Sequence, residues 1–370
     1  MKILLSGALN PAFEALPEYL ASAFRRLGHE VWIFDHRAFL IPGRLRSRLP
    51  FLDHLDREGL NARFLRRARA LRPSLVLINQ GVVLAPRTIE ATRALGARCV
   101  NWFSDYPSEF DEGMRAAPLY DAFFLASSYA AERHLEAGHH RAGWLPFGFD
   151  PAVHRPLDSN RPGDFDPGRD RVVFVGSHYP ERQVLLRFLR GLPVGIWGPG
   201  WERARRDPDL APMIRGGALR PSAWRGLYGQ AEVALNIHYG SFGPREVSGD
   251  LANTRLFEIL GCGAYQVVDR QGDVLRLFQD GQDLDGFSCG DELRSIVERA
   301  LADADRPRRI ASRGRASALS AHTYEHRARM LIDPEARGLG LAQPPEGRSP
   351  AAHAAADGTG LRRAPGGPAR

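Results

Sequence analysis

Short runs of apolar residues alternate along the chain with longer segments whose apolar residues recur at helical spacing. The short runs predict strands and the longer segments predict helices, and Gly28 ends the first of these helices. In the first half, strands are expected at 2–5, 31–34, 75–78, 99–103 and 122–126, with helices at 16–27, 86–95 and 129–137. Such alternation indicates βαβ units built around a parallel sheet.

The same pattern restarts after residues 158–171, whose prolines, glycines and charges are typical of a linker. Strands are then expected at 172–175, 194–197 and 231–237, and helices at 182–189 and 251–260. Few large apolar residues follow position 333, which favours a disordered tail. We therefore expect one domain at 1–157, a second at 172–319, a closing helix at 320–332 and a tail at 333–370.

Both predicted domains are α/β, Rossmann-like and doubly wound, and the chain of 370 residues is long enough to build two cores. In such sheets ligands bind at the carboxyl ends of the strands. We therefore expect the two domains to face each other across a ligand-binding cleft.

Composition narrows the choice of partners. The net charge is +7, but arginine is spread along the chain and no dense basic stripe with interleaved aromatic residues is evident, so nucleic acid is not an expected partner. The three cysteines form no CxxC pair, which favours a reducing compartment. The first apolar run is too short for a secretory signal. We expect a cytoplasmic protein with at most peripheral membrane contact.

The segment 249–264 carries the most informative chemistry. A helix beginning just after Asp250 would direct its first backbone amides toward the cleft and form a diphosphate site. Two turns later, Glu258 could accept hydrogen bonds from a ribose diol, and Asp250 could bind hydroxyl groups of a sugar. The alternatives are that Asp250 only caps the helix and that Glu258 pairs with Arg255 on a solvated face.

An acidic residue, seven intervening residues and a glutamate resemble the motif of retaining glycosyltransferases with the two-domain GT-B fold, with Asp250 where those enzymes usually have Glu. The segments 253–258 and 322–327, together with 101–107 and 144–150, are similar to the CgeB-like, spore-maturation-type group of group 1 glycosyltransferases. The resemblance covers about residues 1–332 and implies a GT-B fold.

The resemblance also implies a nucleotide-diphosphate-sugar donor, such as a UDP-, GDP- or dTDP-sugar, held mainly by the second domain. The catalytic candidates are Asp250 and Asp105, the latter as a base or as a ligand of the acceptor. An Asx turn before Pro107 is an equal alternative for Asp105. The nucleotide-binding candidates are Gly7, Gly176, Arg182, Asn253, Thr254, Arg255 and Glu258.

Arg182 is expected to neutralise the leaving diphosphate, with a surface position as its alternative, and Arg255 is a poorer candidate for that role. The spacing of His322 and His326 fits a metal site, but no third ligand is evident, so no metal and no cofactor besides the donor is expected.

Three other functions compete with the predicted transfer of a sugar to a hydroxyl acceptor of a surface, spore or extracellular glycan. A nicotinamide dehydrogenase is disfavoured because the residues after Ser6 lack GxGxxG spacing. A sugar-nucleotide epimerase and a non-catalytic glycan-binding or surface-maturation protein stay open. The oligomeric state is not predicted.

Overall fold

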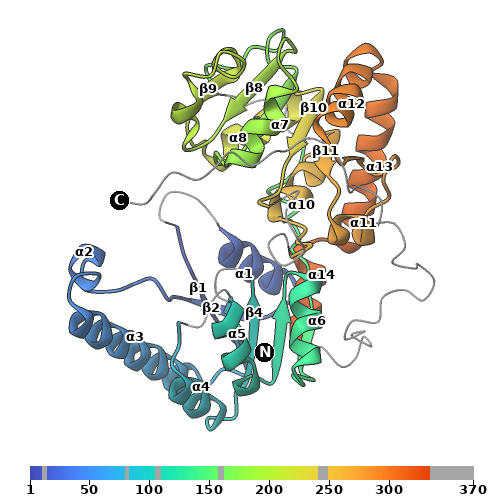
Figure 1. The fold of residues 1–370 in the computed structure, drawn as a ribbon. Helices are drawn as coiled ribbons and strands as arrows, with labels where there is room; N and C mark the ends of the chain where they lie inside the picture. Colours follow the sequence, from blue (N-terminus) through green and yellow to red (C-terminus); the bar gives the residue numbers. More distant parts are fainter. Residues whose placement is uncertain (11–14, 80–82, 105–109, 157–161, 241–248, 334–370) are drawn as a thin grey trace.

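The computed structural model describes residues 1–10, 15–79, 83–104, 110–156, 162–240 and 249–333. It contains two six-stranded sheets in which every pair of neighbouring strands is parallel. Helices flank each sheet, and the two domains stack on one another (Figure 1). The predicted α/β, two-domain GT-B fold is confirmed.

The first sheet is made of β1 (Lys2–Gly7), β2 (Glu30–Asp35), β3 (Leu75–Asn79), β4 (Arg98–Phe103), β5 (Ala122–Leu125) and β6 (Ala142–Trp144), in the spatial order β2-β1-β3-β4-β5-β6. Its helices are α1 (Leu16–Arg26), α2 (Gly43–Arg46), α3 (Pro50–Leu71), α4 (Pro86–Arg93), α5 (Phe110–Ala116) and α6 (Ser128–Glu136), and a 3₁₀ turn covers Ala117–Leu119.

The second sheet is made of β7 (Val172–Val175), β8 (Val194–Trp197), β9 (Ile214–Gly216), β10 (Val233–Asn236), β11 (Gln266–Asp269) and β12 (Asp285–Phe287), in the order β12-β11-β10-β7-β8-β9. Around it lie α7 (Pro180–Arg187), α8 (Pro221–Gln230), α10 (Thr254–Gly261), α11 (Gly272–Leu277), α12 (Gly290–Ala302) and α13 (Asp305–Ala321), with 3₁₀ turns at Trp201–Ala204 and Ala211–Met213. The strand order reverses between β7 and β10, and the carboxyl ends on either side of such a point are where doubly wound sheets bind ligands.

Two sequence predictions need correction. The helix expected at 251–260 begins only at Thr254. The single closing helix expected at 320–332 is two helices, because α13 ends at Ala321 and α14 (Tyr324–Ile332) begins after Thr323, whose hydroxyl caps it. The part of the predicted linker that the structure describes is packed: Phe165 is buried against Trp197, and Asp170 pairs with Arg215 at 2.6 Å.

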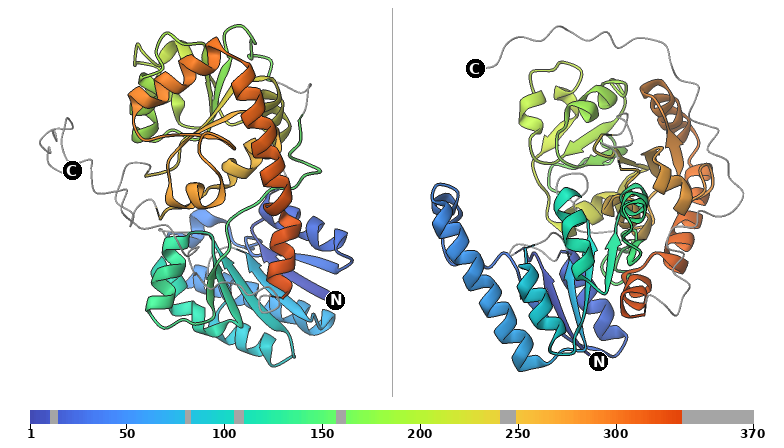
Figure 2. Two further views of the ribbon diagram at one scale, coloured as in Figure 1. Left: turned by 90° about the vertical axis from the view of Figure 1, so that its right-hand side faces the viewer. Right: turned by 60° about the horizontal axis from the view of Figure 1, so that its bottom comes forward.

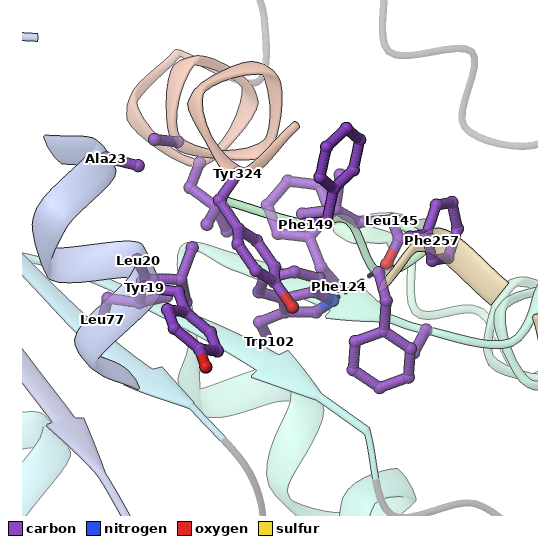
Figure 3. Packing of buried hydrophobic residues seen from close by; sticks show 14 of the residues in the cluster. Tyr19, Leu20, Ala23, Leu77, Trp102, Phe124, Leu145, Phe149, Phe257 and Tyr324 are labelled. Atoms are coloured by element: carbon purple, nitrogen blue, oxygen red, sulfur yellow. Dashed lines mark hydrogen bonds between the residues drawn. The ribbon is translucent and has the colours of Figure 1, made fainter. Parts of the chain in front are cut away.

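The closing helix α14 ties the end of the described chain to the first domain. It packs against α1, while α13 runs along the second domain toward it (Figure 2). The Phe149 backbone pairs with the segment before α14, accepting from Tyr324 N–H at 2.9 Å and donating to the His322 carbonyl at 3.1 Å. Tyr324 lies among Tyr19, Phe149 and other apolar residues of the first domain (Figure 3). One apolar core thus spans both domains, since Phe257 of α10 belongs to the same cluster.

A second contact between the domains is polar. The Asp273 carboxyl in α11 is fully buried and accepts the Ser128 backbone N–H at the start of α6 at 3.0 Å. Burial raises the pKa of Asp273 to about 8, although Ser128 and the Arg276 guanidinium, 3.9 Å away, oppose the shift and Asp250 adds to it. The folded protein therefore holds a proton here that the unfolded chain, with an ordinary Asp pKa of 3.8, releases.

This raised pKa predicts a dependence of stability on pH. Its stabilising contribution is complete below the ordinary Asp pKa of 3.8 and is lost as pH rises toward about 8. Asp273→Asn should remove this slope, so the melting temperature of the wild type relative to the variant should be higher at pH 5 than at pH 8. Asp291→Asn, at an exposed position of α12, serves as the control. The same difference between wild type and Asp273→Asn at both pH values would contradict the assignment.

Candidate functional site

A cleft with a volume of about 290 Å³ lies between the domains at the carboxyl end of β7. The first domain contributes residues of α1 and α14, and the second contributes the turns after β7, β8 and β9 with parts of α8 and α10. The lining residues are Ala15, Leu16, Tyr19, Val175, Gly176, Ser177, Gly198, Pro199, Ala218, Leu219, Pro221, Trp224, Thr254, Arg255, Glu258 and Tyr324. Apolar walls therefore surround a small group of polar side chains.

Two glycine turns form one side of this cleft. Gly176 follows β7, and its N–H donates to the Trp197 carbonyl at 2.9 Å. Gly198 has φ +145°, and a Cβ there would lie 2.0 Å from the Gly176 carbonyl oxygen. Glycine is therefore needed for the two turns to approach so closely. Both glycines are among the residues that line the cleft.

The start of α10 forms the neighbouring side. Asn253 is its N-cap and accepts the Leu256 N–H at 2.9 Å, so Thr254 and Arg255 of the first turn line the cleft. Asn253 and Asn236 exchange side-chain hydrogen bonds at 3.0 and 3.1 Å. Asn253 thus positions the helix end.

His238 holds the N-terminal end of α10 in place through hydrogen bonds. Its Nδ1 lies 2.8 Å from Asp269 Oδ1, and its Nε2 accepts the Asn253 N–H at 3.2 Å. Although burial opposes it, His238 lowers the pKa of Asp269, which also accepts the side-chain amide of Gln271 at 2.7 Å. His238 is hence a buried, hydrogen-bonded residue that supports α10 and is not among the cleft-lining residues.

The Glu258 carboxylate lies in the cleft between two nitrogen groups. Arg255 Nη1 is 3.0 Å from one oxygen, and His154 Nε2 is 3.7 Å from the other. The pairing of Glu258 with Arg255 that the sequence allowed is present, but not on a solvated face, because only 13% of the Glu258 side chain is exposed. Arg255 lies 4.5 Å from the Trp224 ring centre, and Trp224 stacks on His154.

Protonation states follow from burial. Burial lowers the pKa of His154, although Glu258 opposes the shift, so the imidazole is neutral near pH 7. The His154 Nδ1 atom lies 3.1 Å from the Asp150 nitrogen and 3.2 Å from the Asp150 carbonyl oxygen, so Nε2 is the ring nitrogen nearest Glu258. Burial opposes the charge of Arg255, but Tyr228 and Glu258 outweigh it and raise its pKa. Glu258 is therefore held between Arg255 and His154.

Asp250 lies in the turn ahead of α10. It does not cap α10; its backbone has φ 52°, and its carbonyl and carboxylate accept the N–H groups of Asp273 and Gly272 at 3.1 and 3.4 Å. It is absent from the described residues that line the cleft. Asp105 lies outside the described residues.

Two more predicted residues have structural contacts. The Arg182 guanidinium donates to the Ile237 carbonyl at 2.5 and 2.9 Å and to the Ser177 carbonyl at 2.8 Å. It thereby clamps the carboxyl ends of β7 and β10, and burial lowers its pKa. Gly7 faces Pro17, because a Cβ on Gly7 would lie 2.4 Å from the Pro17 ring. Neither residue is among the described ones lining the cleft.

His322 and His326, which have the spacing of metal ligands, make other contacts. No three His, Cys, Asp or Glu residues in the described ranges are grouped as a metal site requires. Arg327 donates to His322 Nδ1 at 2.9 Å, and His326 Nδ1 lies 2.7 Å from the Thr323 hydroxyl. The two histidines thus support the start of α14.

None of the helices within the described part of the chain has the length and apolarity needed to cross a bilayer.

Residues 181–333 match the family model described as glycosyl transferase-like. This glycosyltransferase-like region covers α7 to α14 and includes Thr254, Arg255 and Glu258. No curated protein matches the chain.

Solved structures of the same fold include the HepE protein of Anabaena in complex with UDP-glucose, with 14% identity, a TM-score of 0.60 and coverage of 90% of this chain and 99% of that one. Sucrose-phosphate synthase from Thermosynechococcus elongatus has 12% identity, a TM-score of 0.64 and coverage of 92% and 100%. A putative UDP-N-acetylglucosamine 2-epimerase from Listeria monocytogenes has 13% identity, a TM-score of 0.51 and coverage of 92% and 97%.

Proposed function

We propose that the protein is a glycosyltransferase that uses a nucleotide-diphosphate sugar and transfers the sugar to a hydroxyl group of a surface, spore or extracellular glycan. The observation that carries the proposal is the Glu258 carboxylate, oriented by Arg255 and His154 in a cleft at the point where the strand order reverses. The glycosyltransferase-like region and the fold of UDP-glucose-bound HepE support it.

The cleft offers groups that complement the ribose and the diphosphate of such a donor. The Glu258 carboxylate can accept hydrogen bonds from a ribose diol, which donates through O–H. The glycine turns at Gly176 and Gly198 let backbone come close to phosphates, and Thr254 opens a helix whose N-terminus favours negative charge. Apolar and aromatic walls exclude water around them.

In the proposed reaction, the bond between the sugar's anomeric carbon and the β-phosphate oxygen breaks, and the nucleoside diphosphate leaves. A bond between the acceptor oxygen and the anomeric carbon forms, and the acceptor's proton passes to a base or to the leaving phosphate. Stabilising the leaving diphosphate and holding the acceptor in line would supply most of the rate gain. We propose a hexosyl donor, no metal requirement, membership of the CgeB-like group and a cytoplasmic site of action.

The proposal is tested by adding UDP, GDP, dTDP and, as a control, phosphate to the full chain and measuring the melting temperature. One of the three nucleotides should raise it, because a ligand that binds only the folded state stabilises that state. No shift with any of them would exclude a nucleotide-sugar site. With the matching nucleotide sugar, appearance of free nucleoside diphosphate indicates transfer, whereas an epimerised but intact nucleotide sugar indicates the epimerase alternative.

A further inference from the structure

Residues 37–72 concentrate the positive charge of the protein. The segment holds ten arginines and three acidic residues, so its formal charge of +7 equals that of the whole chain and the remainder is balanced. The expectation that arginine merely raises the charge evenly along the sequence is therefore wrong for α2, α3 and the loop before them.

The same segment also exposes apolar side chains. Among the described residues, nine large hydrophobic side chains are exposed, and five of them lie between positions 40 and 55. They are Leu40, Leu45, Leu49, Phe51 and Leu55, with exposed fractions from 41% to 76%. A cluster of exposed apolar side chains that is surrounded by basic ones marks an interaction surface.

Hydrogen bonds and an ion pair hold the segment that carries these exposed side chains in place. The buried Asp56 accepts the backbone N–H groups of Leu40 and Ile41 at 3.0 and 2.8 Å. Arg46 donates to Asp53 at 2.8 Å and stacks on Phe39 at 3.7 Å, which fastens α2 to α3. The exposed arginines Arg44 and Arg48 make no ion pair with any residue that the structure describes.

The position of the patch relates it to the cleft. Phe64 and Ala68 anchor the later turns of α3 in a core of the first domain, and Leu60 of the same helix is also buried. Because α3 runs back from the carboxyl edge of the sheet to the start of β3, its first turns lie at the carboxyl edge, where the second domain sits. α2 and the beginning of α3 project on the side away from α14 (Figures 1 and 2).

We propose that Leu45, Leu49, Phe51 and Leu55, flanked by Arg44 and Arg48, dock the protein on an anionic lipid surface. Apolar side chains that enter the interface gain free energy by leaving water, and arginines gain about 1 kcal/mol each near anionic head groups. Nucleic acid would match the arginines but would leave the leucines and Phe51 in water. Docking through this edge would present the cleft to acceptors held at a membrane, and it does not depend on the nucleotide assignment.

The test is sedimentation of the full chain with vesicles of phosphatidylcholine alone and with 30% phosphatidylglycerol. We expect binding to the anionic vesicles, reduced at least 10-fold both by Phe51→Ser/Leu55→Ser and by Arg44→Glu/Arg48→Glu. The matched controls are Val184→Ser, an exposed apolar residue of the second domain, and Arg205→Glu/Arg206→Glu, an exposed basic pair there. Both controls should bind like the wild type.

Melting temperatures of all variants without vesicles show that they fold. Equal binding of the wild type and both α2–α3 variants would overturn the proposal, as would absence of binding to anionic vesicles. Binding of duplex DNA or RNA that needs Arg44 and Arg48 but tolerates Phe51→Ser/Leu55→Ser, with no vesicle binding, would show a nucleic-acid surface instead. Loss of nucleotide binding with vesicle binding intact would affect only the proposed reaction.

Discussion

Glu258→Gln should weaken the binding of the stabilising nucleoside diphosphate on the order of 10- to 100-fold, because a hydrogen bond to a charged group contributes about 1.5–3 kcal/mol. Glutamine keeps the size of the side chain but presents one acceptor oxygen instead of two and no charge. Arg255 would also lose the carboxylate that lies 3.0 Å from it, and its positive charge would remain in the cleft without this partner. Isothermal titration of wild type and variant with the same nucleotide measures the effect.

Two comparisons make this result specific. Glu298→Gln, at a half-exposed position of α12 paired with Arg294, should bind nucleotide like the wild type. The melting temperature of Glu258→Gln without nucleotide separates a loss of binding from a loss of folding. Equal affinities in wild type and Glu258→Gln would remove Glu258 from the site, even if the nucleotide binds.

Long apolar stretches on both sides of Glu258 argue against a solvated face, and only 13% of its side chain is exposed. Of its two neighbours, Arg255 was considered from the sequence and His154 was not. Arg255 lies three residues away on the same helix, so their contact follows from helical spacing. His154 lies 104 positions earlier and reaches Glu258 only through the tertiary fold, so no local pattern identifies it.

The start of α10 shows why the predicted helix began three residues too early. Gly249 and Asp250 have left-handed backbone, which cannot continue into a helix, and Asn253 supplies the cap. Asn253 is itself a good N-cap signal in the sequence, but Asp250 is an equally good one by residue type. The choice between the two residues depends on α11, because the Gly272 N–H at its start donates a hydrogen bond to the Asp250 carboxylate.

The long helix α3 was missed for a different reason. Its buried positions form a narrow stripe that includes Leu60, Phe64 and Ala68, while arginines and small residues fill the remainder. Apolar periodicity is weak when half of a helix projects from the domain, and its exposed leucines blur the pattern further. The same projection that hides the helix from sequence analysis creates the proposed lipid-docking surface.

Arg327→Met should lower the free energy of unfolding by about 3–5 kcal/mol, since each buried group left without a partner costs about 1–3 kcal/mol. The buried guanidinium donates to the carbonyls of Pro146, Phe147 and Ala321 at distances from 2.7 to 3.0 Å. Burial lowers its pKa to about 10, so it stays charged at neutral pH. Removing it leaves these carbonyls without their donor, next to Tyr324, which lines the cleft and packs in the first-domain core (Figure 3).

Urea denaturation followed by tryptophan fluorescence measures this loss. Arg329→Met, two residues further along α14, removes an exposed arginine 3.9 Å from Glu325 and should change stability by less than about 0.5 kcal/mol. Arg327→Lys keeps the charge but has no planar fork for several carbonyls, so it should fall between wild type and Arg327→Met. If Arg327→Met were as stable as Arg329→Met, the joint between α14 and the 146–150 segment would rest on apolar packing instead of on these hydrogen bonds.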